Sequence, residues 1–305
     1  MTASSATPQT LRLDFVCGDL RLEVACEPAR APRTFAALGA TLPLDVDLHC
    51  PKIAGSHIYW HAPFLADVEG AIDVMDAAPG AFIYWPERQF LELVYAPLQA
   101  ETAAVTWLGH AVGDIAGLKA LGEGLRRSHG RRRTTARLSA PEFAPTTPAE
   151  KPGVPTEIVA TRKALWARRP ADIAGLLASR ALMHPAGPLF MAESEARILH
   201  EFLWRLRGRE QGAGRFAANI AALKAADRLE GFCHLGLCGG AVRRLAAAFL
   251  DTSIPFAPLL EEAVLTAGRI AASLDLEIPW HDVNVATRNA LDARDGQDAA
   301  VEIVT

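Results

Sequence analysis

Residues 139–155 read SAPEFAPTTPAEKPGVP, and this stretch divides the chain into two parts of different character. Five of the 20 prolines in the 305-residue chain fall within it. Such a composition is typical of an extended, semi-rigid linker, because proline fixes the backbone and removes a hydrogen-bond donor. We therefore predict a linker at 139–155, with one folded domain at 1–138 and a second at 156–305.

Short β-strands dominate the prediction for the first part. Residues 11–16 and 20–24 alternate apolar and polar side chains around Gly18-Asp19, which is the pattern of an antiparallel hairpin. Helices are predicted at 28–42 and 114–127. Further strands are predicted in short aromatic or β-branched runs at 56–61, 82–85 and 91–95. Several short strands with two helices predict a small β-barrel.

The second part changes to helical periodicity. Apolar residues recur every three to four positions in the segments 198–206, 216–226 and 242–249, with Gly or Pro near the segment ends. About seven helices follow from the same reasoning, which predicts an all-α helical bundle. The remaining predicted helices span 156–168, 171–183, 257–274 and 281–294.

Composition and charge exclude several classes of protein. Half of the chain is hydrophobic and 22% is charged, so a fibrous or fully disordered chain is excluded. The formal net charge of −4 provides no chain-wide basic field for a nucleic acid partner. No stretch reaches the roughly 18 apolar residues of a membrane span, and residues 1–10 lack the order of a signal peptide.

The cysteines also favour a cytoplasmic protein. They number five and are scattered along the chain, so they do not form the even-numbered framework of a disulfide-rich secreted protein. We predict reduced thiols and a soluble, cytoplasmic chain without a membrane partner.

The densest polar and aromatic group is GSHIYWH at 55–61. If this segment is a strand, His57, Tyr59 and His61 share one face, roughly 7 Å apart from one to the next. We predict a pocket wall in which His57 and Tyr59 transfer protons, while Ser56, Trp60 and His61 contact the substrate. Ordinary solvent-facing side chains on an antiparallel sheet remain the alternative.

A second candidate group lies in PGAFIYWPER at 79–88. Tyr84 and Trp85 are predicted to stack on an aromatic substrate. Glu87 is a third candidate for proton transfer and Arg88 for carboxylate binding, although an exposed loop tip remains the alternative. Glu92, also a candidate for substrate binding, either faces solvent from the outside of the barrel or points inward as a carboxylate.

Metal and cofactor motifs are weak or missing. Cys233, His234 and Cys238 form half of a metal site with no further pair to complete it, so we predict no metal. The chain has no GxGxxG, GxxxxGK[ST], GxSxG or HExxH motif, so we predict no cofactor. Six arginines at 126–137 are expected to pack against acidic surface rather than nucleic acid.

The order and spacing of Gly18-Asp19 and the segments 55–60, 79–86 and 113–118 resemble a cyclophilin-like barrel of a bacterial type. The Phe-His-Arg strand and Gln-rich loop of prolyl isomerases are missing, so isomerase activity is not expected. With the linker and helices added, the chain resembles the cucumopine synthase family of opine-forming enzymes. That resemblance implies two domains, an N-terminal cyclophilin-like β-barrel with two helices and a C-terminal all-α helical bundle.

The resemblance also implies a function. A cucumopine synthase-like enzyme condenses an amine or amino acid with a 2-oxo acid by Pictet–Spengler-type ring closure, which needs no redox cofactor. Its partners are then small-molecule substrates, bound in the barrel, and the helical bundle could pair two copies as a homo-oligomer. The alternative is a non-catalytic, small-molecule-binding cyclophilin-like protein without prolyl isomerase activity.

Overall fold

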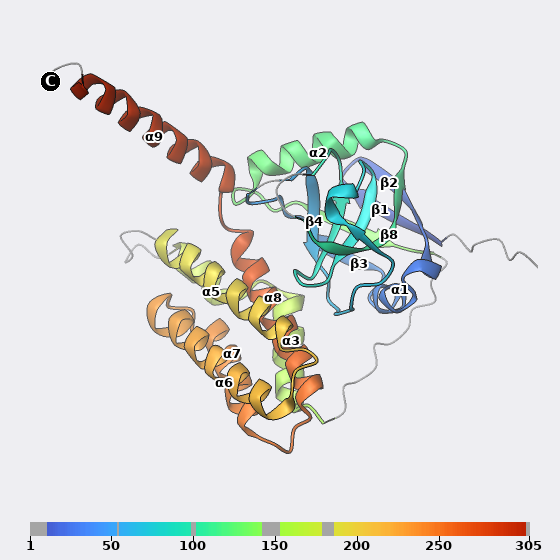
Figure 1. Ribbon diagram of the computed structural model, residues 1–305, viewed down its shortest axis with the longest axis vertical. Helices are drawn as coiled ribbons and strands as arrows, with labels where there is room; N and C mark the ends of the chain where they lie inside the picture. The colour runs from blue at the N-terminus through green and yellow to red at the C-terminus, as the bar shows by residue number, and fades with distance from the viewer. Residues whose placement is uncertain (1–10, 54, 99–101, 142–152, 179–185, 303–305) are drawn as a thin grey trace, which may run out of the picture.

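In the computed structural model, a barrel-shaped antiparallel sheet packs beside a group of helices (Figure 1). The structure describes residues 11–53, 55–98, 102–141, 153–178 and 186–302, except for the side chains of 295–302. Most of the predicted linker lies outside these residues, so the division at 139–155 stays a prediction. The last strand ends at Ser139 and the next helix begins at Thr156.

Within the described residues, nine strands form one sheet in the order β3-β9-β1-β2-β8-β6-β7-β4, with β5 paired to β8. The predicted hairpin at Gly18 is confirmed, and its two strands pair in register. The strands are β1 (Leu11–Cys17), β2 (Leu20–Cys26), β3 (Leu44–Asp47), β4 (His57–His61), β5 (Ala71–Asp73), β6 (Ala81–Trp85), β7 (Phe90–Val94), β8 (Ala104–Val112) and β9 (Thr135–Ser139).

A two-residue bridge brings the two ends of the sheet together. The N–H of His49, just after β3, donates to the carbonyl of Tyr59 on β4 at 2.8 Å, and the N–H of Tyr59 donates back at 3.1 Å. The interior of the nearly closed barrel is packed solid, because Trp60 lies 5.9 Å from Phe15 and 6.0 Å from Phe82 between ring centroids. These rings belong to a large cluster of buried apolar side chains that forms the core of the barrel.

The helices fall mostly where the periodicity predicts them. In the first part, α1 (Pro32–Gly39) and α2 (Ile115–Ser128) accompany the short helices η1 (Pro28–Arg30) and η2 (Val74–Asp76). In the second part, the helices are α3 (Thr156–Ala167), α4 (Ala171–Ala178), α5 (Ala186–Arg205), α6 (Gln211–Asp227), η3 (Arg228–Phe232), α7 (Gly236–Leu250), α8 (Phe256–Asp275) and α9 (Trp280–Glu302). No helix among the described residues is long and apolar enough to cross a bilayer.

Helices α5 and α6 leave part of their apolar stripes exposed. On α6 the buried side is formed by small residues such as Ala218, Ala222 and Ala225, which allow close approach to α7. The larger apolar residues of these stripes are substantially exposed on α5 and α6; they are Ile198, Phe202, Phe216, Ile220 and Leu223. Assembly of two copies through the helices stays a prediction.

The predicted pairing of the arginine cluster with acidic side chains is confirmed for three of its members. Arg131 Nε lies 2.6 Å from Asp282 and Arg133 Nη2 lies 2.6 Å from Glu277, so both arginines connect the barrel to the second part of the chain. The third is Arg137, which pairs with Asp45 at 3.0 Å within the sheet. Asp282, the partner of Arg131, lies in the first turn of α9.

Gly130 packs closely against the joint between α8 and α9. Its φ is +78°, and a β-carbon there would overlap the backbone of Ile278 and Pro279. We expect Gly130→Ala to lower the free energy of unfolding by about 1–3 kcal/mol, because both backbone strain and steric overlap oppose it. Urea unfolding followed by circular dichroism measures the change.

Gly124, on α2, is the matched control for this substitution. A β-carbon at Gly124 would meet nothing within 4 Å, so Gly124→Ala should be neutral or stabilising by up to about 1 kcal/mol. Equal changes in the free energy of unfolding for Gly130→Ala and Gly124→Ala would contradict the close packing of Gly130 against Ile278 and Pro279.

Candidate active site

The candidate site begins with the alternation of β4. Ile58 and Trp60 point into the barrel, whereas His57, Tyr59 and His61 occupy the opposite face, as predicted. That opposite face is the outer surface of the barrel, and α5 and α8 lie against it. Tyr59 and His61 of this face lie between the barrel and the helices, because they contact Asp275 of α8 and Arg197 of α5.

Buried polar side chains form a layer between the barrel and helices α5 and α8. Asp275, the last residue of α8, lies at the centre of this polar layer. Its Oδ2 accepts from His49 Nδ1 at 2.6 Å and from the Tyr59 hydroxyl at 3.3 Å. Its Oδ1 accepts from Trp280 Nε1 at 2.9 Å and lies 3.1 Å from Lys52 Nζ. Burial alone would raise the pKa of Asp275, but Lys52 and the hydrogen bond from His49 outweigh burial and hold that pKa well below its usual value.

Tyr59 is held rigidly within the layer. Its ring stacks on His49 at 4.9 Å and on Phe90 at 4.2 Å between centroids. Burial, followed by the charge of Asp275, raises the pKa of the phenol well above 10, so Tyr59 stays protonated at neutral pH. A fixed, protonated hydroxyl is suited to donating a hydrogen bond rather than to giving up its proton.

Helix α5 supplies the other wall of the layer. Arg197 donates to Glu193 at 3.2 Å and to His61 Nε2 at 3.3 Å, so His61 acts as an acceptor. His200 Nε2 lies 3.1 Å from Gln89 Oε1, and because an amide oxygen only accepts, this ring nitrogen carries the proton. Burial lowers the pKa of His200 to about 3 and that of His61 well below 6.5, with the charge of Arg197 adding to both shifts.

His57 and Glu92 form a pair at the other end of β4. Glu92 lies on β7 opposite Tyr59, and its Oε2 is 3.7 Å from His57 Nε2. We predicted that Glu92 either faces solvent from the outside of the barrel or points inward, and neither prediction is correct. The carboxyl lies on the outer face of the barrel and is nevertheless only 1% exposed. Burial, then the charges of Arg126 and Arg88, lower the pKa of His57 to about 4. His57 is therefore neutral at pH 7 and keeps 12% of its side chain exposed.

Two predicted stacking residues belong to the barrel core. Trp60 packs between Phe15 and Phe82, and Tyr84 lies against Phe64 with ring centroids 5.3 Å apart. Successive side chains of a strand point to opposite faces of the sheet. Trp60 therefore points into the barrel between Tyr59 and His61 on β4, and Tyr84 does so between Ile83 and Trp85 on β6. Neither lies with His57 on the outer face.

The loop after β6 lies at the His61 end of the β4–β7 ladder, and of its side chains Arg88 acts on His57 through its charge. Glu87 is exposed and pairs with Arg205 of α5 at 2.7 Å. Arg88 lies over the ring of Trp85, with its guanidinium carbon 4.8 Å from the ring centroid. His57 lies at the far end of the β4–β7 ladder from this turn, so Glu87 does not share the pocket wall with His57 and Tyr59.

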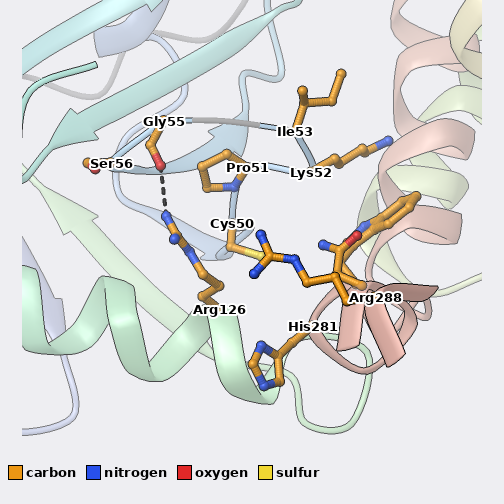
Figure 2. Close-up of a pocket in the computed structure, with 11 residues that line it drawn as sticks. Cys50, Pro51, Lys52, Ile53, Gly55, Ser56, Arg126, His281 and Arg288 are labelled. Carbon is orange, nitrogen blue, oxygen red and sulfur yellow. Dashed lines mark hydrogen bonds between the residues drawn. The ribbon is translucent and has the colours of Figure 1, made fainter. Parts of the chain in front are cut away.

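A cavity of about 390 Å³ opens beside the layer (Figure 2). Its lining includes Ser56, Lys52 and Trp280, and the last two also contact Asp275. Arg126 of α2 extends toward Gly55 in the loop before β4, and Arg288 of α9 also lines the cavity. The lining is therefore strongly basic. Volumes of about 300–1,000 Å³ are usual for sites that bind small molecules.

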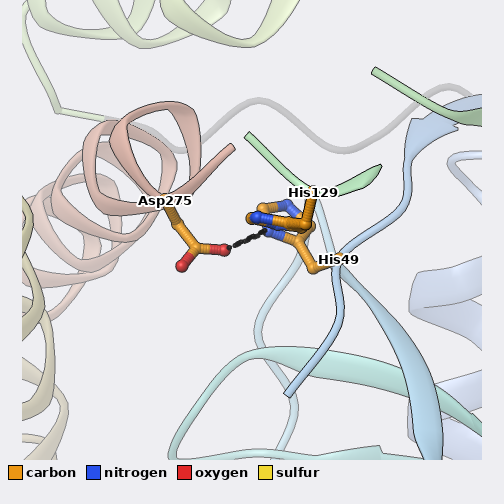
Figure 3. A group of neighbouring side chains, drawn as sticks. All are labelled: His49, His129 and Asp275. Carbon is orange, nitrogen blue, oxygen red and sulfur yellow. Dashed lines mark hydrogen bonds and ion pairs between the residues drawn. The ribbon is translucent and has the colours of Figure 1, made fainter. Parts of the chain in front are cut away.

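His49, His129 and Asp275 could ligate a metal ion (Figure 3). Among the described residues, they offer ligand atoms that lie within 4.8 Å of one another. His129 Nδ1 donates to the carbonyl of Ile278 at 3.0 Å, which turns Nε2 toward Asp275 Oδ2 at 3.6 Å. The ammonium of Lys52 already balances the charge of this carboxylate. The cluster is thus electrostatically complete as an ion-paired group, and the absence of a metal stays a prediction.

Sequence reasoning missed most of the partners in this layer. His49, Lys52, Glu193, Arg197 and Asp275 carry no motif, and the pairs they form span up to 226 positions of sequence. One signal was available: Asp275 is an acid at the C-terminal end of α8, where the helix dipole disfavours a carboxylate. An acid in that position indicates a compensating cation from elsewhere in the fold.

Asp275→Asn tests the role of this carboxylate in stability. The change keeps the side-chain size but leaves the buried His49 and the partly buried Lys52 without the charge of their shared partner, so we expect the free energy of unfolding to fall by about 3–5 kcal/mol. Asp282→Asn, which breaks the exposed pair with Arg131, should cost less than about 1 kcal/mol. Urea unfolding of both variants checks the difference, and a tolerated Asp275→Asn would refute the central role of the acid.

Acid should destabilise the fold through its buried neutral histidines. The pKa values of His49 and His57 are lowered to about 4 and that of His200 to about 3, so between these values and the ordinary 6.5 only the unfolded chain takes up the protons. Stability is therefore complete above pH 6.5 and falls as the pH drops toward 4, by about 1 kcal/mol per pH unit for each histidine.

The melting temperature measured from pH 7.5 to 4.5 checks this dependence. His200→Gln should reduce the dependence of the melting temperature on pH by the contribution of one histidine, because glutamine does not titrate. A melting temperature that rises on acidification would contradict the neutral buried histidines.

Comparison with known proteins identifies the architecture. The sequence matches no protein-family model and no curated protein. The solved structure of McbB in complex with tryptophan matches with a TM-score of 0.69 and 17% identity, over 90% of this chain and 99% of McbB. The solution structure of the hypothetical protein AF2241 from Archaeoglobus fulgidus matches 44% of this chain and 98% of its own at 19% identity. Its TM-score of 0.32 is too low to indicate a shared fold. The chain therefore has a McbB-like fold, a barrel-shaped sheet followed by helices, whereas its cyclophilin-like character and its place in the cucumopine synthase family stay predictions.

Proposed function

We propose that this protein binds an amino acid or aromatic amine together with a 2-oxo acid and condenses them by Pictet–Spengler-type ring closure. One observation carries the proposal. The neutral His57, paired with the buried Glu92, directly follows Gly55 and Ser56, which line a basic cavity of about 390 Å³. The similarity to a fold that holds tryptophan in McbB adds support.

The reaction uses only proton transfers and bond changes within the substrates. The amine nitrogen attacks the keto carbon, water leaves, and a protonated imine forms. The ring carbon of the amine then bonds to the imine carbon, and the proton on that ring carbon passes to a base. The product mass equals amine plus acid minus water, and no redox cofactor is required.

We assign the base role to His57. Its lowered pKa keeps the imidazole neutral and able to accept the ring proton, and Glu92 at 3.7 Å would stabilise the imidazolium that forms. Because a neutral imidazole holds no spare proton, His57 is less suited to protonating the departing hydroxyl. Tyr59 would orient the layer through Asp275 rather than exchange its proton.

Trp280 replaces the barrel aromatics as the stacking residue in this proposal. It lines the cavity, whereas Trp60 and Tyr84 point into the barrel core. Ser56 and His61 remain candidate binding residues, since Ser56 lines the cavity and His61 faces the same layer. A non-catalytic binding protein for the same small molecules is the competing hypothesis.

Mass spectrometry of the purified protein with paired substrates tests the activity. A simple imine has the same mass as the cyclised product, so tryptophan carrying deuterium at indole carbon 2 is incubated with a 2-oxo acid. Ring closure replaces that deuterium and yields an acid-stable product one mass unit lighter than the imine. Binding of both substrates without loss of deuterium would favour the non-catalytic protein.

The variants His57→Gln and Glu92→Gln sharpen the test. Each should lower turnover by about 10²- to 10⁴-fold, the usual contribution of a general acid or base, while the protein stays folded. Glu87→Gln is the control, because Glu87 pairs with Arg205 on the exposed turn and should change turnover by less than about threefold. Equal losses in all three variants would reject the assignment of His57 as the base.

A further inference from the structure

The cavity holds an excess of positive charge that the described side chains do not neutralise. Among the cavity-lining residues that the structure describes there is no aspartate or glutamate, while Lys52, Arg126 and Arg288 all contribute. Lys52 is already paired with Glu193 and Asp275. The surplus therefore belongs to the two arginines.

Arg126 is held in place by neutral acceptors. Its Nη2 donates to the carbonyl of Gly55 at 2.8 Å and to the Tyr95 hydroxyl at 3.3 Å. Arg288 approaches the same cavity from α9 and has no acidic partner among the described side chains. The cavity is thus lined by two guanidinium groups from separate elements, and no acid among its described lining residues lies between them. Such a pair of guanidinium groups fits an anion.

We infer that this cavity is a carboxylate-binding subsite in which Arg126 and Arg288 hold the anionic group of a small-molecule substrate. The inference rests on the proposed function only for the identity of the anion, because binding can be measured without turnover. It also moves the carboxylate-binding role from Arg88, which stacks on Trp85, to a different pair of arginines.

The subsite is coupled to His57 through Gly55. The carbonyl of Gly55 accepts from Arg126, and a β-carbon at Gly55 would lie 2.7 Å from the imidazole of His57, so the ring packs directly against this glycine. The charged and titratable groups that face His57 are Arg126, Arg88, Glu92 and Tyr59. An anion on Arg126 would offset one of the two cations that lower the His57 pKa, so bound substrate would make His57 a stronger base.

Isothermal titration calorimetry of the full chain tests the subsite with succinate, propionate, inorganic phosphate and the neutral succinamide. We expect succinate to bind more tightly than phosphate and succinamide not to bind. Arg126→Gln and Arg288→Gln should each weaken succinate binding by about 10- to 100-fold, the usual value of a charge-assisted hydrogen bond. Arg127→Gln, an exposed neighbour on α2, should stay within about twofold of the parent.

Several outcomes would overturn the inference. Unchanged succinate affinity in both arginine variants would do so, as would phosphate binding more tightly than any carboxylate. If Arg126→Gln fails to fold, Arg288→Gln on the exposed α9 decides the question alone. In the parent protein, the His57 pKa followed by NMR should rise on adding succinate.

The subsite and the proposed reaction can fail separately. Anion binding that depends on Arg126 and Arg288, with no condensation product from any substrate pair, would keep the subsite and reject the synthase. Product formation with an unchanged KM for the acid in both variants would keep the synthase and reject the subsite.

Discussion

The carboxylate of Asp275 connects the two parts of the chain. It ends α8 in a fully buried position and accepts hydrogen bonds or ion pairs from the barrel side, through His49 and Tyr59, and from the residues around the cavity, through Lys52 and Trp280. A buried charge of this kind is stable only when several partners surround it. The positions of β4, of the loop after β3 and of α9 are therefore fixed relative to α8 by the solvation of one acid.

The chemistry of the layer follows from the same low-polarity surroundings. Burial keeps His49, His57 and His200 neutral, and it keeps Tyr59 protonated. The layer thus presents neutral imidazoles beside cations, because Arg197 contacts His61 and the charges of Arg126 and Arg88 act on His57. These cations add to the effect of burial and keep the imidazoles unprotonated.

Local patterns were predictable from the sequence, whereas contacts across the chain were not. The hairpin at Gly18, the alternation of β4 and the positions of the helices follow from periodicities of two and 3.6 residues, which local sequence records directly. Glu92 and Asp275 show the limit of such reasoning. The face of a strand is readable, but whether a helix from the other half of the chain covers that face is not. The outward direction of Phe216 on α6 has the same cause, because small residues on the other side pack more closely against α7.

The bridge between His49 and Tyr59 has a consequence for motion. These two residues join the open ends of the sheet by main-chain hydrogen bonds, and their side chains also contact Asp275. Any transient parting of this seam would withdraw an imidazole and a phenol from the buried acid at the same moment. Fraying of the sheet at its seam and disassembly of the polar layer are thus a single event, so the amide protons of His49 and Tyr59 should exchange with solvent together, at a rate that reports how often the layer comes apart.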